Sequence, residues 1–125
     1  MDLDGAFIEK CNFKSAMLKG TSFRDARLLG SDFTKAHTER CSFTSSEVSE
    51  SDFTGAILYD ATFRHAKVKG TSFRHAHLDG ADFRGATQGL PDQWEGAVGT
   101  FWPPQGVLTL VQAAEERAAA AAAGG

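Results

Sequence analysis

The chain has 125 residues, with 13 Lys or Arg and 16 Asp or Glu side chains that give a formal net charge of −3. A charge this small predicts neither direct binding to nucleic acid nor attraction to an anionic membrane, and no apolar run approaches the roughly 18 residues that a transmembrane helix needs. Its two cysteines cannot form a disulfide framework and its acidic N-terminus is unlike a signal peptide, so we expect a cytoplasmic protein.

A five-residue repeat begins at the N-terminus and continues to about residue 88. Every fifth position from Leu3 to Phe83 is large and apolar, with Thr38 as the one exception, and the position two residues earlier is small from Ala6 to Ala86. Because side chains two apart on an extended segment point the same way, each unit is predicted to send one small and one large side chain inward. Glycine recurs two residues after the large position, where a turn needs a positive φ. A chain that bends in one direction every five residues winds into a coil.

The large inward positions alternate between two kinds of side chain. Phenylalanine recurs every ten residues from Phe13 to Phe83, and Leu, Val or Thr occupies the positions between. Like side chains stack on like only if each coil holds an even number of units. Two units leave no room for side chains and six enclose a void, whereas four fill the interior at normal density. The sequence therefore predicts an all-β, four-sided coil with 20 residues per turn and about four turns in residues 1–88.

The repeat units resemble the pentapeptide-repeat motif, in which a small residue, then Asp, Asn or Ser, then Leu or Phe, precede two variable polar positions. Examples are Ala-Asp-Phe-Arg-Gly at 81–85, Ser-Asp-Phe-Thr-Gly at 51–55 and Cys-Asn-Phe-Lys-Ser at 11–15. The resemblance implies a right-handed quadrilateral β-helix. It also raises an alternative function, because some members bind DNA gyrase or topoisomerase IV as DNA mimics and protect against quinolones or toxins. That mimicry needs an acidic rod, whereas residues 1–88 carry twelve acidic and twelve Lys or Arg side chains.

Thr38 is the weakest point of the repeat, and two interpretations of it remain open. It is either a tolerated defect whose hydroxyl bonds to the backbone, or part of a bulge that re-aims His37 and Glu39 for binding. The in-register start at Met1 also leaves two alternatives: an excised domain, or an open end that pairs with another chain.

After residue 88 the composition changes. Residues 89–106 are rich in Gly, Pro and aromatic side chains, which predicts a capping loop across the last coil. The alternative is a dimer interface through this end of the solenoid, for which Trp94, Phe101 and Trp102 are the candidate contacts; the resemblance also implies such dimers. Residues 107–125 predict a short C-terminal helix followed by an Ala-rich tail.

One outward column of the predicted coil is unbalanced in charge, with Arg24, Arg64 and Arg84 around a single threonine. These arginines are the candidate interaction face, suited to an acidic partner or to phosphates; the alternative is an ordinary exposed polar column. We recognise no catalytic triad, phosphate-binding loop, metal site or cofactor site in the sequence. The leading interpretation is a non-enzymatic protein-interaction scaffold whose partner the sequence does not identify.

Overall fold

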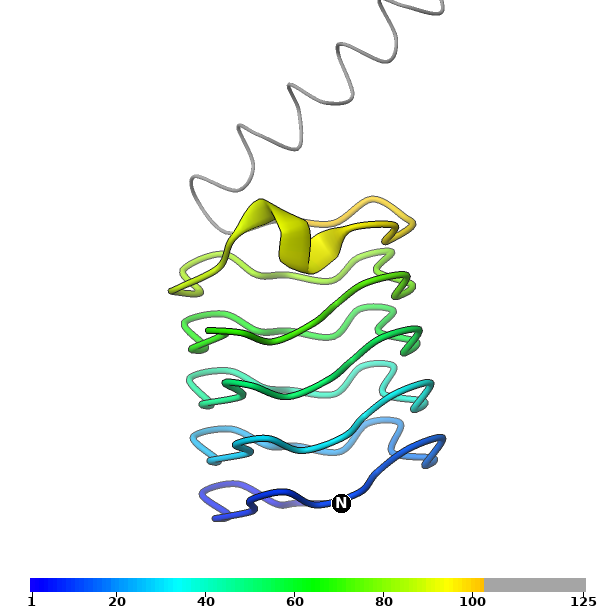
Figure 1. Cartoon of the computed structure of the whole chain (residues 1–125). Helices are drawn as coiled ribbons and strands as arrows, with labels where there is room; N and C mark the ends of the chain where they lie inside the picture. Colours follow the sequence, from blue (N-terminus) through cyan, green and yellow to red (C-terminus); the bar gives the residue numbers. More distant parts are fainter. Residues whose placement is uncertain (103–125) are drawn as a thin grey trace, which may run out of the picture.

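The structure is a computed structural model that describes residues 1–102. Figure 1 shows these residues as a stack of flat rungs that rises from the N-terminus. The helix and tail predicted for 107–125, and the end of the segment 89–106, lie outside the described residues.

Parallel bridges join each rung to the next, at a separation of 20 residues. They run from Asp2↔Ser22 to Lys67↔Thr87 without interruption. The N–H of a large inward residue donates to the rung above, as in Phe33 N to Asp52 O at 2.7 Å. Each side of the rung supplies only one bridging residue before the chain turns, so the described residues contain bridges rather than strands. Their only helical element is η1, a 3₁₀ helix at Pro91–Trp94.

All seventeen corner positions from residue 5 to residue 85 have a positive φ, as the glycine pattern predicts. Seven are glycine, and ten are other residues, such as Lys10 at 53° and His65 at 61°. Each of these ten departs from the preferred backbone conformation at a cost of about 1 kcal/mol. Their presence shows that ladder hydrogen bonds and core packing outweigh the local preference at every corner.

Two columns of stacked phenylalanines fill the centre of the rod, which confirms the predicted alternation. Rings in one column lie 4.6–5.4 Å apart, and the two columns meet edge to face at 4.8–6.4 Å; the columns are Phe13, Phe33, Phe53 and Phe73, and Phe23, Phe43, Phe63 and Phe83. From Phe23 to Phe83 every one of these side chains is fully buried. The interior therefore holds side chains rather than a channel.

Thr38 is a tolerated defect and not a bulge. Its side chain is fully buried, and its Oγ1 donates to the carbonyl of Ile57 at 2.9 Å. The bridges of the adjacent His37 to Met17 and to Ile57 keep the regular spacing. The backbone thus absorbs the hydroxyl without changing the path of the chain.

The ladder continues beyond residue 88, where the repeat pattern stops. Bridges join His77 to Val98 and Asp82 to Trp102, so residues 89–102 add a further layer to the stack. The N–H of Phe73 donates to Gln93 O, twenty residues on, whereas Phe33 and its equivalents bond nineteen residues on. The segment that contains η1 takes up this extra residue.

The side chain of Gln93 fastens this added layer to the repeat. It is nearly buried, and its Nε2 donates to the carbonyls of Val68 and Thr71 at 2.7 and 2.8 Å. Its Oε1 accepts the N–H of Leu90 at 2.7 Å. In the regular repeat a shorter inward side chain bonds to the carbonyl equivalent to that of Val68, as Thr71 Oγ1 does to Val48 O at 2.6 Å.

Candidate interaction surfaces

Arg84 differs from the other two predicted arginines because it is firmly paired with a carboxylate. Its guanidinium forms a two-point ion pair with Asp82, with Nε–Oδ1 and Nη2–Oδ2 distances of 3.0 and 2.8 Å, and it also lies over the ring of Trp102. The hydrogen bonds from Arg84 hold the pKa of Asp82 below its usual value. Arg64 approaches the same carboxylate only at 3.8 Å. Arg84 is therefore neutralised locally, and Arg24 and Arg64 form the remaining basic pair.

Arg24 and Arg64 border a shallow hollow of about 530 Å³, which we call the arginine groove. Its lining is Arg24, Ser42, Thr44, Thr62, Arg64 and His65. The hollow exists because the short side chain of Thr44 stands in the column between the two long arginines.

The three aromatic residues proposed as cap or dimer contacts have different environments. Trp94 is 5% exposed and stacks on Phe73 at 5.2 Å, where it extends the phenylalanine column. Phe101 is half-buried and meets Phe83 edge to face at 6.0 Å. Trp102 is 52% exposed. Two of the three thus cover the end of the core, and one points outward.

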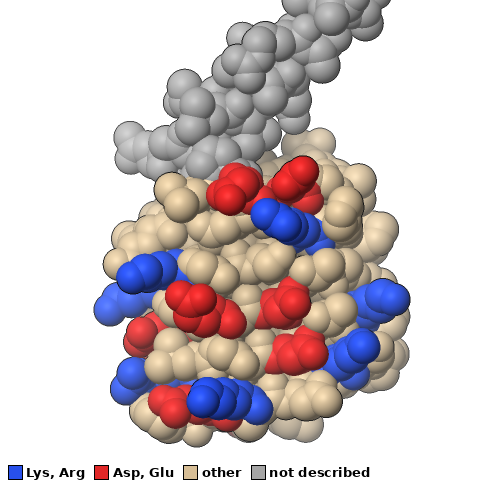
Figure 2. Space-filling model, in the orientation of Figure 1, with Lys and Arg blue, Asp and Glu red and all other residues tan. Residues whose placement is uncertain are grey.

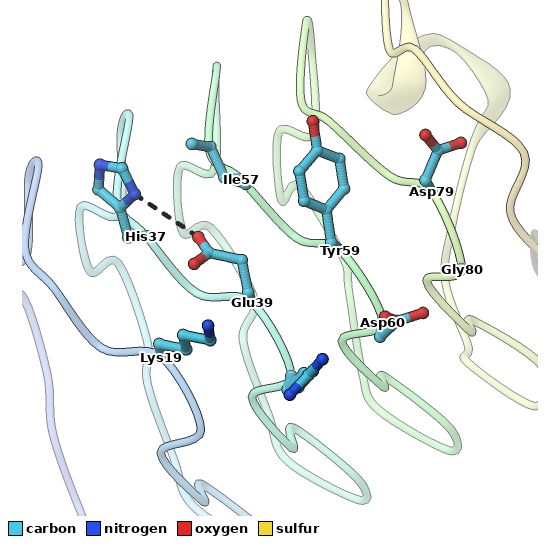
Figure 3. A pocket seen from close by; sticks show the side chains of 9 residues that line it. Lys19, His37, Glu39, Ile57, Tyr59, Asp60, Asp79 and Gly80 are labelled. Atoms are coloured by element: carbon cyan, nitrogen blue, oxygen red, sulfur yellow. Dashed lines mark ion pairs between the residues drawn. The ribbon is translucent and has the colours of Figure 1, made fainter.

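A second and larger hollow, of about 620 Å³, lies on another side of the rod (Figure 3), and we call it the tyrosine groove. Its lining is Lys19, His37, Glu39, Arg40, Ile57, Tyr59, Asp60, Asp79 and Gly80. Tyr59 stands between Glu39 and Asp79, which hold the same position on the neighbouring rungs. Polar and apolar side chains therefore alternate along this surface.

One carboxylate oxygen of Glu39 has no hydrogen-bond donor in the described part of the chain. This atom, Oε1, is buried, and the Nδ1 of His37 lies 3.6 Å from it, beyond hydrogen-bonding distance. Desolvating a carboxylate oxygen without a donor is unfavourable. Glu39 thus keeps one buried carboxylate oxygen without a donor in the lining of the groove.

Exposed apolar residues extend the tyrosine groove along the rod. Met17, at 76% exposure, and Val98, at 51%, belong to the column that contains His37, Ile57 and His77. From the sequence alone, a joint binding role for His37 and Glu39 is expected only if Thr38 forms a bulge. Aligning the chain at 20-residue intervals reveals this column, but not which side chains border a hollow.

Opposite charges are mixed over the rest of the described surface. Figure 2 shows Lys and Arg interspersed with Asp and Glu on the visible face. Arg27 and Glu47, on successive rungs, pair at 3.4 Å. Such exposed pairs contribute little stability but oppose misaligned stacking. The described rod thus lacks a continuous acidic face on the side drawn.

Neither cysteine forms a candidate reactive or metal-binding centre in residues 1–102. Burial raises the pKa of Cys41 to about 11, and its Sγ lies 3.0 Å from the carbonyl of Leu18. No group of three or more His, Cys, Asp or Glu residues in this part of the chain could hold a metal ion. No helix among the same residues is long and apolar enough to cross a membrane.

Comparison with known families identifies the repeat. One model of pentapeptide repeats matches residues 1–30 and 56–87, and a second matches residues 23–67, so together they span the whole repeat. The chain belongs to the pentapeptide-repeat family. The stack of bridged rungs is accordingly the right-handed β-helix of pentapeptide-repeat proteins.

Solved structures similar to this pentapeptide-repeat chain share little sequence with it. Rfr23 from the cyanobacterium Cyanothece 51142 is 18% identical, with 85% of each chain covered and a TM-score of 0.38. HetL from Nostoc sp. strain PCC 7120, involved in heterocyst differentiation regulation, is 18% identical over 81% of this chain and 59% of its own, with a TM-score of 0.43. QnrB1, a plasmid-mediated fluoroquinolone resistance protein, is 14% identical over 79% of this chain and 64% of its own, with a TM-score of 0.35. No curated protein matches the chain.

Proposed function

We propose that this pentapeptide-repeat chain is a non-enzymatic protein-interaction scaffold, and that the tyrosine groove is its docking site. The proposed partner is a protein segment in extended conformation that carries a basic side chain beside an apolar one. The observation that carries the proposal is that exposed Tyr59 and half-buried Ile57 line one hollow together with the carboxylates of Glu39, Asp60 and Asp79.

The rigidity of the rod favours binding at this surface. The backbone beneath the groove is held on both sides, since His37 donates to Ala16 O and Ile57 donates to Ala36 O at 2.8 and 2.9 Å. Little ordering of the scaffold is then required when a partner binds, which leaves more of the interaction energy for affinity.

The chemistry of the lining selects the partner. Glu39, Asp60 and Asp79 supply carboxylates on three successive rungs, and a Lys or Arg of the partner would pair with them. The aliphatic stem of that basic side chain and an adjacent apolar residue would cover Tyr59 and Ile57. Lys19 and Arg40 are also part of the lining, so a uniformly basic segment would be repelled.

The sole tyrosine of the chain gives a direct test. Incorporation of 3-fluorotyrosine places a single ¹⁹F resonance at position 59, in the centre of the groove. The probe is a synthetic ten-residue peptide that alternates Val and Thr with one central Arg, and its partner probe carries Glu in place of Arg. The arginine peptide should shift or broaden the resonance at submillimolar concentration, and the glutamate peptide should not.

Matched variants make the test specific. Glu39→Gln should weaken binding of the arginine peptide by about tenfold, the value of one hydrogen bond to a charged group. Glu47→Gln, on another side of the rod and also partly exposed, should leave binding unchanged. If both peptides act alike, or if the two variants have equal effects, the groove is not the docking site proposed.

We do not extend the function of QnrB1 to this chain. Binding to DNA gyrase by charge mimicry requires an acidic rod, and the repeat has equal numbers of acidic and basic side chains. We expect a supercoiling assay with and without a quinolone to show no effect at micromolar chain concentration. Inhibition or drug protection would instead favour the topoisomerase alternative.

A further inference from the structure

The arginine groove has no carboxylate among its lining side chains. Two guanidinium groups and three hydroxyl groups can all donate hydrogen bonds into it, and His65 stands at the corner. This concentration of donors occurs on a chain whose formal net charge is negative. The groove is therefore chemically opposite to the tyrosine groove, which contains three carboxylates.

The hydroxyl groups of the floor keep donor capacity for a ligand. Ser42 Oγ lies 3.3 Å from Thr44 Oγ1, and Thr44 Oγ1 lies 3.5 Å from Thr62 Oγ1. These separations are longer than the usual distance of about 2.8 Å between hydroxyl oxygens, so the contacts are weak. An anion in the groove could attract these hydroxyl protons without breaking a strong internal bond.

The carboxylates of Asp82 and Asp4 lie near the two arginines but already accept shorter hydrogen bonds from other donors. Asp82 is bound at two points by Arg84, and lies 3.8 Å from Arg64. Asp4 accepts hydrogen bonds from the Ser22 hydroxyl and from the backbone N–H of Arg24. Within residues 1–102, neither the Arg24 nor the Arg64 guanidinium has a carboxylate at hydrogen-bonding distance.

The spacing of the arginines suits one ligand between them. Arg24 and Arg64 stand at the same position two rungs apart, about 10 Å along the rod, with only Thr44 between. Both side chains line the same hollow of about 530 Å³. Guanidinium groups bind phosphate in two-point fashion, and a phosphomonoester has three acceptor oxygens for two arginines and a hydroxyl. A carboxylate has only two oxygens and would leave one of these three donor groups without an acceptor.

We propose that the arginine groove, formed by Arg24, Arg64 and the hydroxyl floor of Ser42, Thr44 and Thr62, binds a phosphomonoester dianion. The proposal does not depend on the docking function of the tyrosine groove, which lies on a different side of the rod. The probes are inorganic phosphate and a peptide with one phosphoserine, each titrated at fixed moderate salt because exposed charges are screened. At least one of the two probes should shift the amide resonances of residues 42–44 and 62–65. If only the phosphopeptide causes a shift, the site is assigned to a phosphorylated protein. If inorganic phosphate binds as tightly as the phosphopeptide or more tightly, the site is assigned to a small phosphate ester.

Two kinds of variant separate binding from folding. Arg64→Gln should weaken phosphate binding by about tenfold or more, as expected for a charge-assisted hydrogen bond. Arg74→Gln is the matched control, since Arg74 holds the same position in its unit and its side chain is 50% exposed against 51% for Arg64. Thr44→Glu should abolish binding and keep or raise thermal stability, because its carboxylate would pair with Arg24 and Arg64 and occupy the groove.

Three results would overturn the proposal. One is the absence of any response to millimolar phosphate or phosphopeptide. Another is an equal loss of affinity in Arg64→Gln and Arg74→Gln, which would indicate general screening of charge. The third is tighter binding of a single-stranded oligonucleotide than of the phosphopeptide, which would assign the arginines to a phosphodiester backbone instead.

Discussion

Replacement of a phenylalanine in the middle of the stack should be about twice as damaging as replacement at its lower end. Phe53 is fully buried between two parallel rings, Phe33 at 4.6 Å and Phe73 at 5.4 Å. The edges of Phe43 and Phe63 approach it at 5.5 Å each. Every aromatic contact of this ring is thus with another core phenylalanine, and Phe53→Ala removes four of them together.

The size of the effect follows from the rigidity of the rungs. A buried Phe→Ala substitution costs about 3–5 kcal/mol, and more when the surroundings cannot collapse into the cavity. Around Phe53 the rung spacing is fixed by ladder bonds, such as Phe53 N to Ser72 O at 2.7 Å. We therefore expect a loss of about 4 kcal/mol or more, a large fraction of the roughly 5–15 kcal/mol by which a domain is stable. Phe53→Leu, which leaves less empty space, should cost about 1–2 kcal/mol and ensures a folded variant.

Phe13→Ala is the matched control. Phe13 is only half-buried and has one parallel neighbour, Phe33 at 4.8 Å, so its loss should cost about half as much. Urea unfolding followed by circular dichroism and by tryptophan fluorescence gives the free energies, and a lower m-value in Phe53→Ala would show that the rod unfolds in separate parts. Equal losses at positions 13 and 53, or a loss below about 1 kcal/mol at position 53, would refute the argument that the stacked rungs are coupled.

Three further predictions concern the defect, the corners and the thiols. Thr38→Leu should raise the free energy of unfolding by on the order of 0.5–1 kcal/mol, because two additional buried carbons outweigh one lost hydrogen bond. The Ile57 carbonyl still accepts the backbone N–H of residue 38, at 2.9 Å. A lower melting temperature would show that the site has no room for Leu. Gly20→Ala should cost about 1 kcal/mol through backbone strain alone, since φ is +75° and an added Cβ meets nothing within 4 Å; an unchanged melting temperature would contradict this. At pH 8, Cys41 should react with iodoacetamide at least about a hundredfold more slowly than Cys11 in the native chain, because its raised pKa leaves little thiolate; the two rates should become equal in denaturing urea, and equal rates without urea would contradict its burial.

The periodic part of the structure could be read from the sequence because each unit repeats the same local choice. Phe13, Phe33 and Phe53 are placed at 20-residue intervals, and their stacking follows from that interval. The corner positions could be located in the same way, although only seven of seventeen hold glycine. The buried hydroxyl of Thr38 is one of the two interpretations that the sequence left open, and its bond to the Ile57 carbonyl on the next rung decides between them.

The grooves could not be predicted from the same pattern. The sequence places Arg24, Arg64 and Arg84 in one column, but the two-point ion pair with Asp82 that removes Arg84 depends on side-chain conformation. The Nδ1 of His37 and the Oε1 of Glu39 lie 3.6 Å apart, slightly too far for a hydrogen bond. No rule of sequence spacing determines a side-chain distance to this precision.

The five-residue period by itself determined the solenoid, its inward and outward faces, its positive-φ corners and the two phenylalanine columns. This was possible because neighbouring rungs make the same contacts again and again, so a local rule becomes a global one. Only the tertiary structure decided how the chain continues after residue 88, where Trp94 joins the phenylalanine column although its segment has one extra residue. That position depends on the non-repeating contacts of η1 and on the buried amide of Gln93, which bonds to carbonyls 22 and 25 residues earlier in the chain. Contacts of this kind occur once, and a sequence contains no repetition from which to infer them.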